Sequence, residues 1–402
     1  MTSLVLVASG LVAWGTLGPG ESKRPLEIEV AAGAVVATDP AGAALALQEL
    51  RRAIETNDAE RARSVAAATP TAQALLESLV SNAAEARIAD VSLRYIDEQG
   101  STGQDGTWTA AVAVEWRYDG FDVSPASTET VVGFVVEADE VRISQIGADS
   151  LRTPLWMAGP FAVSRTDSTL VLATDPTRLA LYARLAERSV RVVSRVLTDW
   201  DERLVLEIPR DQMSLERALD VEAGDYQQIA AVAGSADGSV SEDSPVHVYV
   251  NLEVFDGLGK KGREVVLAHE AAHVAGDGPT SRAPMWLIEG FADYVALRDS
   301  SLPLSKTAAQ IREQVRIDGL PRALPAPVDF DTRGPHLGAV YESAWLVCRV
   351  LAERRDSESL VDFYQNVSYG KSFRTALRQT FDWSERDLLA NWHATLLRLP
   401  TS

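Results

Sequence analysis

The amino-acid sequence predicts an α+β protein with two domains: a curved sheet preceded by helices, and then a mainly helical domain with a small mixed sheet. The order of the hydrophobic patterns is the first observation, because helical runs precede a series of strand-like runs in the first part of the chain. The length of 402 residues is the second, since a domain usually takes on the order of 100 to 200 residues. The third is a balance of 46% hydrophobic and 24% charged residues, which is typical of globular proteins.

The first segment of the chain is uncharged and apolar. It reads "SLVLVASGLVAWGTLG" and is followed by the polar "PGESKRP". This length is marginal for a helix that spans a bilayer and also fits the core of a signal peptide. We expect residues 1–20 to be a signal or membrane-anchor segment and residues 21–39 to be a linker, which implies an exported, secreted or membrane-anchored protein. A buried first strand or helix of the fold is the alternative.

The first domain is expected over residues 40–150. A helical pattern begins at Gly42 with "AALALQELRRAIETNDAERARSVAA", and a second follows at "TAQALLESLVSNAAEA". Strand-like runs come next, separated by turn residues: "IADVSLRYID", "TWTAAVAVEWRYD", "ETVVGFVVEAD" and "EVRISQIG". This order resembles the SnoaL-like, or nuclear-transport-factor-like, cone domain, whose opening helices fill the mouth of a strongly curved sheet. No catalytic dyad stands out, so we interpret the domain as an accessory or interaction domain.

The second domain is expected over residues 155–402, after the boundary "SLRTPLWMAGPF". Its opening elements are a strand, a long amphipathic helix and another strand: "STLVLATD", "PTRLALYARLAERSVRVVSRVL" and "ERLVLEIP". The stretch from Ala230 to Ser244 is rich in Gly, Ser and Asp, which predicts a mobile loop, with residues 233–244 as a lid over a cleft. A strand, "PVHVYVNL", then precedes the helix with the main motif.

That motif is "VVLAHEAAHVAGDG", which contains His269, Glu270 and His273. Residues four apart lie on one face of a helix, so the two imidazoles are able to meet one metal ion. Glu270 is offset round the helix, where it cannot chelate with them but can reach a metal-bound water. A hydrolytic zinc site needs both metal-binding histidines and a carboxylate that does not bind the metal, because the metal acidifies water and the carboxylate takes its proton.

A third ligand and an orienting carboxylate are predicted in the next helix, "MWLIEGFADYVALRD". Glu289 follows His273 by sixteen residues, enough for a turn and a returning helix. Asp293 lies one helical turn further on the same face. A carboxylate there is placed to accept the second ring N–H of a ligand histidine and fix its orientation.

These two helices resemble the gluzincin metallopeptidases, and the segment W-L-x-E-G-x-A-x-Y resembles the thermolysin-like peptidase MA group of bacterial, often membrane-bound or exported, proteins. The similarity covers about residues 160–400, with a shorter spacing between the two helices than in thermolysin. The resemblance implies a Zn²⁺ cofactor, a peptide or protein substrate, and the following residues: His269, His273 and Glu289 as metal ligands, Glu270 as general base and acid, and Asp293 as a partner of His269.

The oxyanion-stabilising residue and the substrate-binding strand are also expected from this resemblance. Related enzymes use a tyrosine or histidine of a later helix for the oxyanion, and in "GPHLGAVYESAW" Tyr341 is the better candidate and His336 the alternative. The strand "PVHVYVN" stands where gluzincins present an edge strand to an extended peptide. His247 and His393 have no partner motif and are expected at a sheet edge or helix surface.

Charge and composition exclude other classes of protein. With 57 acidic and 38 basic residues the net charge is -19, which argues against a nucleic-acid partner. The single cysteine, Cys348, lies in an apolar run and is expected in the core. The sequence therefore predicts a zinc metallopeptidase. The alternatives are a catalytically inactive zincin-fold binding or scaffold protein at the membrane, and a peptidase that is gated by a small ligand in the first domain.

Overall fold

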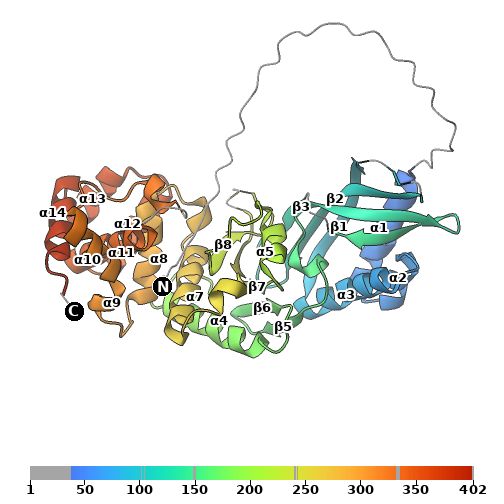
Figure 1. The fold of residues 1–402 in the computed structure, drawn as a ribbon, viewed down its shortest axis with the longest axis horizontal. Coiled ribbons are helices and arrows are strands. Elements are labelled where there is room, and N and C mark those ends of the chain that lie inside the picture. Colours follow the sequence, from blue (N-terminus) through green and yellow to red (C-terminus); the bar gives the residue numbers. More distant parts are fainter. Residues whose placement is uncertain are drawn as a thin grey trace, which may run out of the picture.

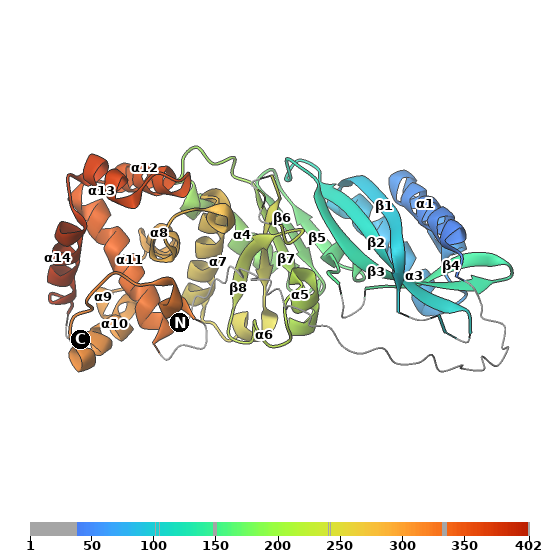
Figure 2. The same cartoon turned by 90° about the horizontal axis from the view of Figure 1, so that it is seen from above.

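A computed structural model describes residues 38–100, 102–103, 105–147, 151–239, 241, 243–331 and 336–400. The molecule is elongated, with an N-terminal domain (residues 38–147) at one end and a C-terminal domain (residues 151–400) making up the rest (Figure 1 and Figure 2). The predicted signal or anchor segment, residues 1–20, and residues 21–37 of the predicted linker lie outside the described residues. Among the described helices, none combines the length and the apolar character that a membrane span requires.

The N-terminal domain places three helices against an antiparallel sheet. The helices are α1 (Pro40–Thr56), α2 (Ala59–Val65) and α3 (Pro70–Ala86), and the strands, in spatial order, are β1 (Ile88–Gln99), β2 (Thr107–Tyr118), β3 (Ala126–Glu137) and β4 (Glu140–Ile146). This layout confirms the predicted order of helices followed by a meander. One detail is corrected: the first helical run breaks into two helices, because Asn57 adopts a left-handed conformation and Asp58 caps α2 by accepting from the Arg61 amide.

The C-terminal domain begins with a five-stranded sheet in the order β5-β6-β7-β9-β8. Its strands are β5 (Ala162–Arg165), β6 (Thr169–Ala173), β7 (Leu204–Ile208), β9 (Val246–Val250) and β8 (Ala231–Ser235). The three central strands are parallel, and the two outer strands pair antiparallel to their neighbours, which confirms the small mixed sheet. The short strand β5 and the helix α5 (Gln212–Leu219) were not predicted.

Two predictions about the edge of this sheet are wrong. The expected mobile loop from Ala230 to Ser244 contains β8, so residues 233–235 belong to the sheet and not to a lid. The strand expected at the edge, β9, lies between β7 and β8, and β8 is the edge strand. The physical reason is backbone pairing: the Ala236 amide donates to the Pro245 carbonyl at 2.8 Å, and the Asn251 amide donates to the Ala230 carbonyl at 3.0 Å, so that the hairpin closes at both ends.

Both faces of the five-stranded sheet are covered. Side chains alternate along a strand. In β6, Val171 faces the core of the C-terminal domain, while Leu170 and Leu172 pack with Tyr118 and Phe121 of the N-terminal domain. Helices α4 (Leu179–Val193) and α7 (Lys260–Ala275) lie side by side on the first face, and the N-terminal domain lies against the other (Figure 2).

The remaining helices form the far end of the molecule. They are α6 (Leu252–Phe255), α8 (Met285–Leu297), α9 (Leu304–Thr307), α10 (Ala309–Asp318), α11 (Leu337–Arg354), α12 (Ser357–Ser368), α13 (Phe373–Phe381) and α14 (Glu385–Leu396). Helix α8 packs between α7 and α11. Trp286, Trp345 and Cys348 are buried there, as expected. Gly290 lets α8 approach α11 closely, because a Cβ atom at this position would lie 2.5 Å from the carbonyl carbon of Ala344.

Candidate metal centre

Two adjacent helices bring the predicted ligands together. His269 and His273 lie one turn apart on α7, and Glu289 lies on α8. The two Nε2 atoms are 3.0 Å apart, and Glu289 Oε2 lies 3.3 Å from His269 Nε2 and 3.6 Å from His273 Nε2. Ligand atoms about 2.0–2.1 Å from one tetrahedral zinc ion stand roughly 3.3 Å from each other. The three side chains therefore have the spacing of a zinc ligand set, and all three are buried.

The electrostatics of the cluster are also compatible with a bound cation. Glu289 is fully buried, and within the described part of the chain neither of its carboxylate oxygens has a hydrogen-bond partner. Burial alone raises the pKa of Glu289, but the neighbouring His273 and His269 lower it to about 2, so the carboxylate is charged. A buried charge without hydrogen bonds is costly unless it is paired or binds a metal. A divalent cation held by these three residues fits this arrangement.

Asp293 lies where it was expected, one turn after Glu289 on α8. Its Oδ1 atom is 2.8 Å from His269 Nδ1. Burial lowers the pKa of His269, but the charges of Asp293 and Glu289 outweigh burial and raise it well above its usual value. The bond to Asp293 leaves Nε2 of His269 directed toward Glu289 and His273, which is the orientation a metal ligand needs.

Glu270 is fully buried beside this cluster and contacts the edge strand of the sheet. Its Oε2 atom accepts from the Ala233 amide on β8 at 2.9 Å, and among the described residues its Oε1 atom has no hydrogen-bond partner. Burial raises the pKa of Glu270 to about 8. A pKa near the operating pH lets one carboxyl group both take up and release a proton, as a group that acts as general base and then as general acid must. The contact with Ala233 could not be predicted, because β8 itself had no recognisable pattern.

The structure separates the two oxyanion candidates. Tyr341 is buried on α11, with its ring centroid 6.3 Å from that of His269 and 5.4 Å from that of Phe330. His336 is exposed at the N-terminal end of α11 and lines a different cavity, together with Pro321 and Trp392. Tyr341 thus lies beside the cluster, and the alternative assignment to His336 is not supported by its position.

A small cavity of about 80 Å³ adjoins the cluster. It shares Asp293 and Tyr341 with the site. Leu258, Val265, Val266, Leu297 and Leu302 form an apolar part of its wall, and Lys306, Thr307, Gln310 and Glu342 form a polar part.

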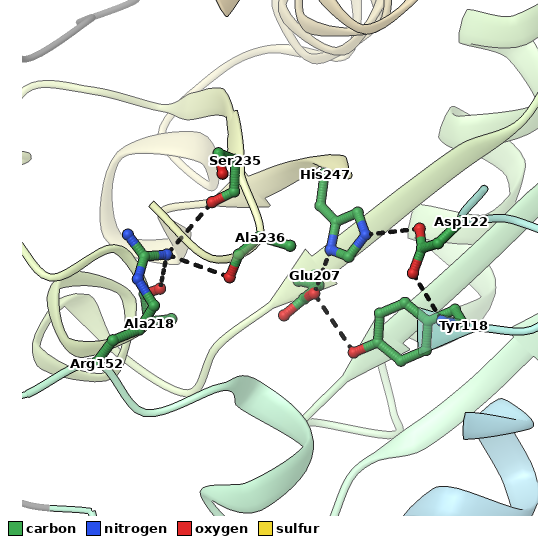
Figure 3. Close-up of polar contacts among 8 residues, drawn as sticks. All are labelled: Tyr118, Asp122, Arg152, Glu207, Ala218, Ser235, Ala236 and His247. Carbon is green, nitrogen blue, oxygen red and sulfur yellow. Dashed lines mark hydrogen bonds and ion pairs between the residues drawn. The ribbon is translucent and has the colours of Figure 1, made fainter. Parts of the chain in front are cut away.

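His247 was expected at a sheet edge or a helix surface. It is instead fully buried in β9, an inner strand of the sheet (Figure 3). Its Nδ1 atom is 2.8 Å from Glu207 Oε1, and its Nε2 atom is 3.0 Å from Asp122 Oδ1. The sequence gives no signal for this network, because Asp122 precedes His247 by 125 residues. His393 lies on α14, and its Nε2 atom donates to the Pro321 carbonyl at 2.8 Å.

No family model matches the chain, and no curated protein matches it.

Proposed function

We propose that this protein is a zinc-dependent metallopeptidase of the gluzincin, peptidase MA-like group. The observation that carries the proposal is the buried cluster of His269, His273 and Glu289 with Glu270 and Asp293 beside it. Three protein ligands and a nearby carboxylate are the composition of a catalytic zinc site, whereas structural zinc sites use four protein ligands. When bound, Zn²⁺ would polarise the substrate carbonyl and acidify a water molecule.

Each side chain has a part in this reaction. Glu270 takes a proton from water and delivers it to the leaving nitrogen of the cleaved peptide bond. Asp293 holds the imidazole of His269 in position through the 2.8 Å contact. Tyr341, with its ring 6.3 Å from that of His269, is the candidate donor to the oxygen that becomes negative in the transition state.

The substrate is proposed to bind as an extended peptide along β8. Ala230 and Ala236 pair with β9, so the backbone groups of Ala231 and Ala233 are directed away from β9. The Ala233 amide already donates to Glu270, which leaves the Ala231 backbone and the Ala233 carbonyl for a peptide. The Ala233 amide lies 2.9 Å from Glu270, so a peptide paired with this edge runs past the general base. The cavity beside Tyr341 is proposed to receive one side chain of that peptide.

Two further features belong to the same proposal. The N-terminal domain is proposed to be a SnoaL-like cone, on the grounds of its three helices followed by a four-stranded antiparallel meander. Export, or anchoring at a membrane, is proposed from the uncharged segment at residues 1–20.

The test combines zinc content with cleavage. Purified protein should contain one zinc per chain and cleave an unstructured protein such as casein, and a chelator should stop the cleavage. Glu270→Gln should abolish cleavage while the zinc content stays the same. Glu264→Gln is the matched control: it makes the same chemical change on the same helix, where Glu264 pairs with Lys261. Zinc without any cleavage would favour a binding or scaffold protein, and absence of zinc would refute the site.

A further inference from the structure

The N-terminal domain contacts the end of the edge strand β8 of the proposed peptidase and its neighbour β9. The interface between the domains has an apolar part, in which Tyr118 and Phe121 pack against Leu170, Leu172 and Val205 of the sheet. Two buried polar groups, one centred on His247 and one on Arg152, accompany it (Figure 3). Both connect the N-terminal domain, or the segment that leaves it, to strands next to the candidate metal centre.

The first group joins the N-terminal domain to the strand beside β8. Asp122 follows β2, accepts from the Tyr118 amide at 2.7 Å and faces His247 of β9. The other ring nitrogen of His247 faces Glu207 of β7. Burial lowers the pKa of His247, but the two carboxylates outweigh it and raise the pKa to about 10, so the imidazole is charged. His247 pairs with Gly234 of β8, the residue after the one that contacts Glu270.

The second group contacts β8 itself. Arg152 is 6% exposed, and its guanidinium donates to four backbone carbonyls in two places. At the end of α5 the acceptors are the carbonyls of Ala218 and Leu219, at 2.7 and 2.6 Å. At the end of β8 they are the carbonyls of Ser235 and Ala236, at 3.3 and 3.4 Å (Figure 3). Arg152 thereby ties the end of the edge strand to α5.

The segment that carries Arg152 is fixed to the N-terminal domain. Trp156 is fully buried in the hydrophobic core of that domain, and Asn82 of α3 donates to the Trp156 carbonyl at 2.9 Å. Ala236, which follows β8, is buried in the same core. The Ser127 amide of β3 also donates to Asp237 at 3.2 Å. The end of β8 is therefore packed and bonded against the N-terminal domain.

We propose that Arg152 is a positioning residue for Glu270, and that the N-terminal domain, through Arg152 and Asp122, sets the position of the edge strand β8 in the proposed peptidase. The link from Arg152 to the general base is short. It runs from the Ser235 carbonyl along two residues of β8 to the Ala233 amide, which holds the Glu270 carboxylate. This inference rests on the proposed function, and it assigns the N-terminal domain a part in forming the active site.

The experiment compares Arg152→Met and Arg152→Lys with Arg117→Met. Arg117 is the matched control because its ion pairs, with Asp90 and Asp119, stay within the N-terminal domain. The readouts are hydrogen exchange of β8 and of β6, zinc content, and kcat and KM for cleavage of casein. Lysine keeps the charge but has no planar fork with which to reach both pairs of carbonyls.

Arg152→Met should speed the exchange of β8 by about tenfold while β6 keeps the wild-type rate. Its kcat should fall on the order of 10-fold to 100-fold, because displacement of a catalytic group by about 1 Å has an effect of that size. Zinc content should stay at the wild-type value, Arg152→Lys should be intermediate, and Arg117→Met should match the wild type. Exchange of β8 at the wild-type rate, or equal acceleration of β8 and β6, would overturn the proposal.

A second variant keeps the proposal testable when Arg152→Met does not fold. Asp122→Asn removes the charge that faces His247 and retains an oxygen for the Tyr118 amide. Asp122→Asn should speed hydrogen exchange in β9 and β8 and lower kcat, while its zinc content stays unchanged. Exchange rates and kcat equal to those of the wild type would contradict the proposal. Absence of cleavage by the wild-type protein would refute the proposed function, whereas the exchange of β8 in the variants would still decide the role of Arg152.

Discussion

Gly290→Ala should weaken metal binding without touching a ligand. Gly290 is the neighbour of Glu289 on α8, at the point where this helix crosses α11. The added Cβ would lie 2.5 Å from the carbonyl carbon of Ala344 and 3.0 Å from Cys348 Sγ. Carbon atoms in contact normally stand about 3.5–4.0 Å apart, so the two helices must separate by about 1 Å. Sites of this kind tolerate displacements of only about 0.5 Å.

The expected effect has two components. Overpacking a tight helix contact lowers the free energy of unfolding by about 1–3 kcal/mol. Displacing Glu289 and Asp293 from the histidines of α7 should weaken zinc binding on the order of 10-fold to 100-fold, the size seen when the support of a ligand is lost. Urea unfolding measures the first quantity, and competition with a chromophoric chelator measures the second.

Gly262→Ala is the matched control, because it places the same methyl group on α7 with its nearest neighbour, Leu258 Cβ, at 3.4 Å. The control should leave zinc affinity unchanged and stabilise the protein by up to about 1 kcal/mol, since alanine favours a helix over glycine. If Gly290→Ala bound zinc as tightly as the wild type and unfolded at the same urea concentration, the close approach of α8 and α11 would not be what positions Glu289.

Three further predictions concern single polar groups. Asp293→Asn should weaken zinc binding about 10-fold to 100-fold, as measured by competition with a chelator, whereas Asp299→Asn, at an exposed ion pair, should leave it unchanged. Equal zinc affinities of the two variants would contradict the role of Asp293. Tyr341→Phe should lower kcat about 100-fold to 1000-fold in steady-state assays with zinc content unchanged, and an unaltered kcat would remove it from the oxyanion role. The pKa of His247 rises from 6.5 to about 10 on folding, so its stabilising contribution is complete below pH 6.5 and is lost as the pH rises to 10. Between pH 6.5 and 10 the free energy of unfolding of the wild type should therefore fall more steeply with pH than that of His247→Gln, by up to about 1.4 kcal/mol per pH unit. Parallel plots of unfolding free energy against pH for the two proteins would refute this.

Local periodicity made the metal cluster predictable from the sequence. His269 and His273 share a helix face because they are four residues apart, and Glu289 and Asp293 do so for the same reason. Only the meeting of the two helices had to be inferred from a resemblance, and the distances between the four side chains are consistent with it. Helices followed by a meander were predictable in the N-terminal domain because each element carries its own pattern.

Contacts between distant segments were not predictable. The residues Ala231, Val232 and Ala233 are too few and too small to indicate a strand, and the Gly and Ser residues after them indicate a loop. Pairing with β9 is what makes them a strand. His247 is an isolated histidine in the sequence, and its charged neighbours come from another strand and another domain.

The sharing of core residues between the domains affects how the protein unfolds. Trp156 and Ala236 belong to the C-terminal part of the chain but are buried in the core of the N-terminal domain. Opening either domain would expose the apolar interface around Leu170 and Leu172 and leave the charges around His247 without partners. We therefore expect partial unfolding to be disfavoured and the two domains to unfold as one cooperative unit.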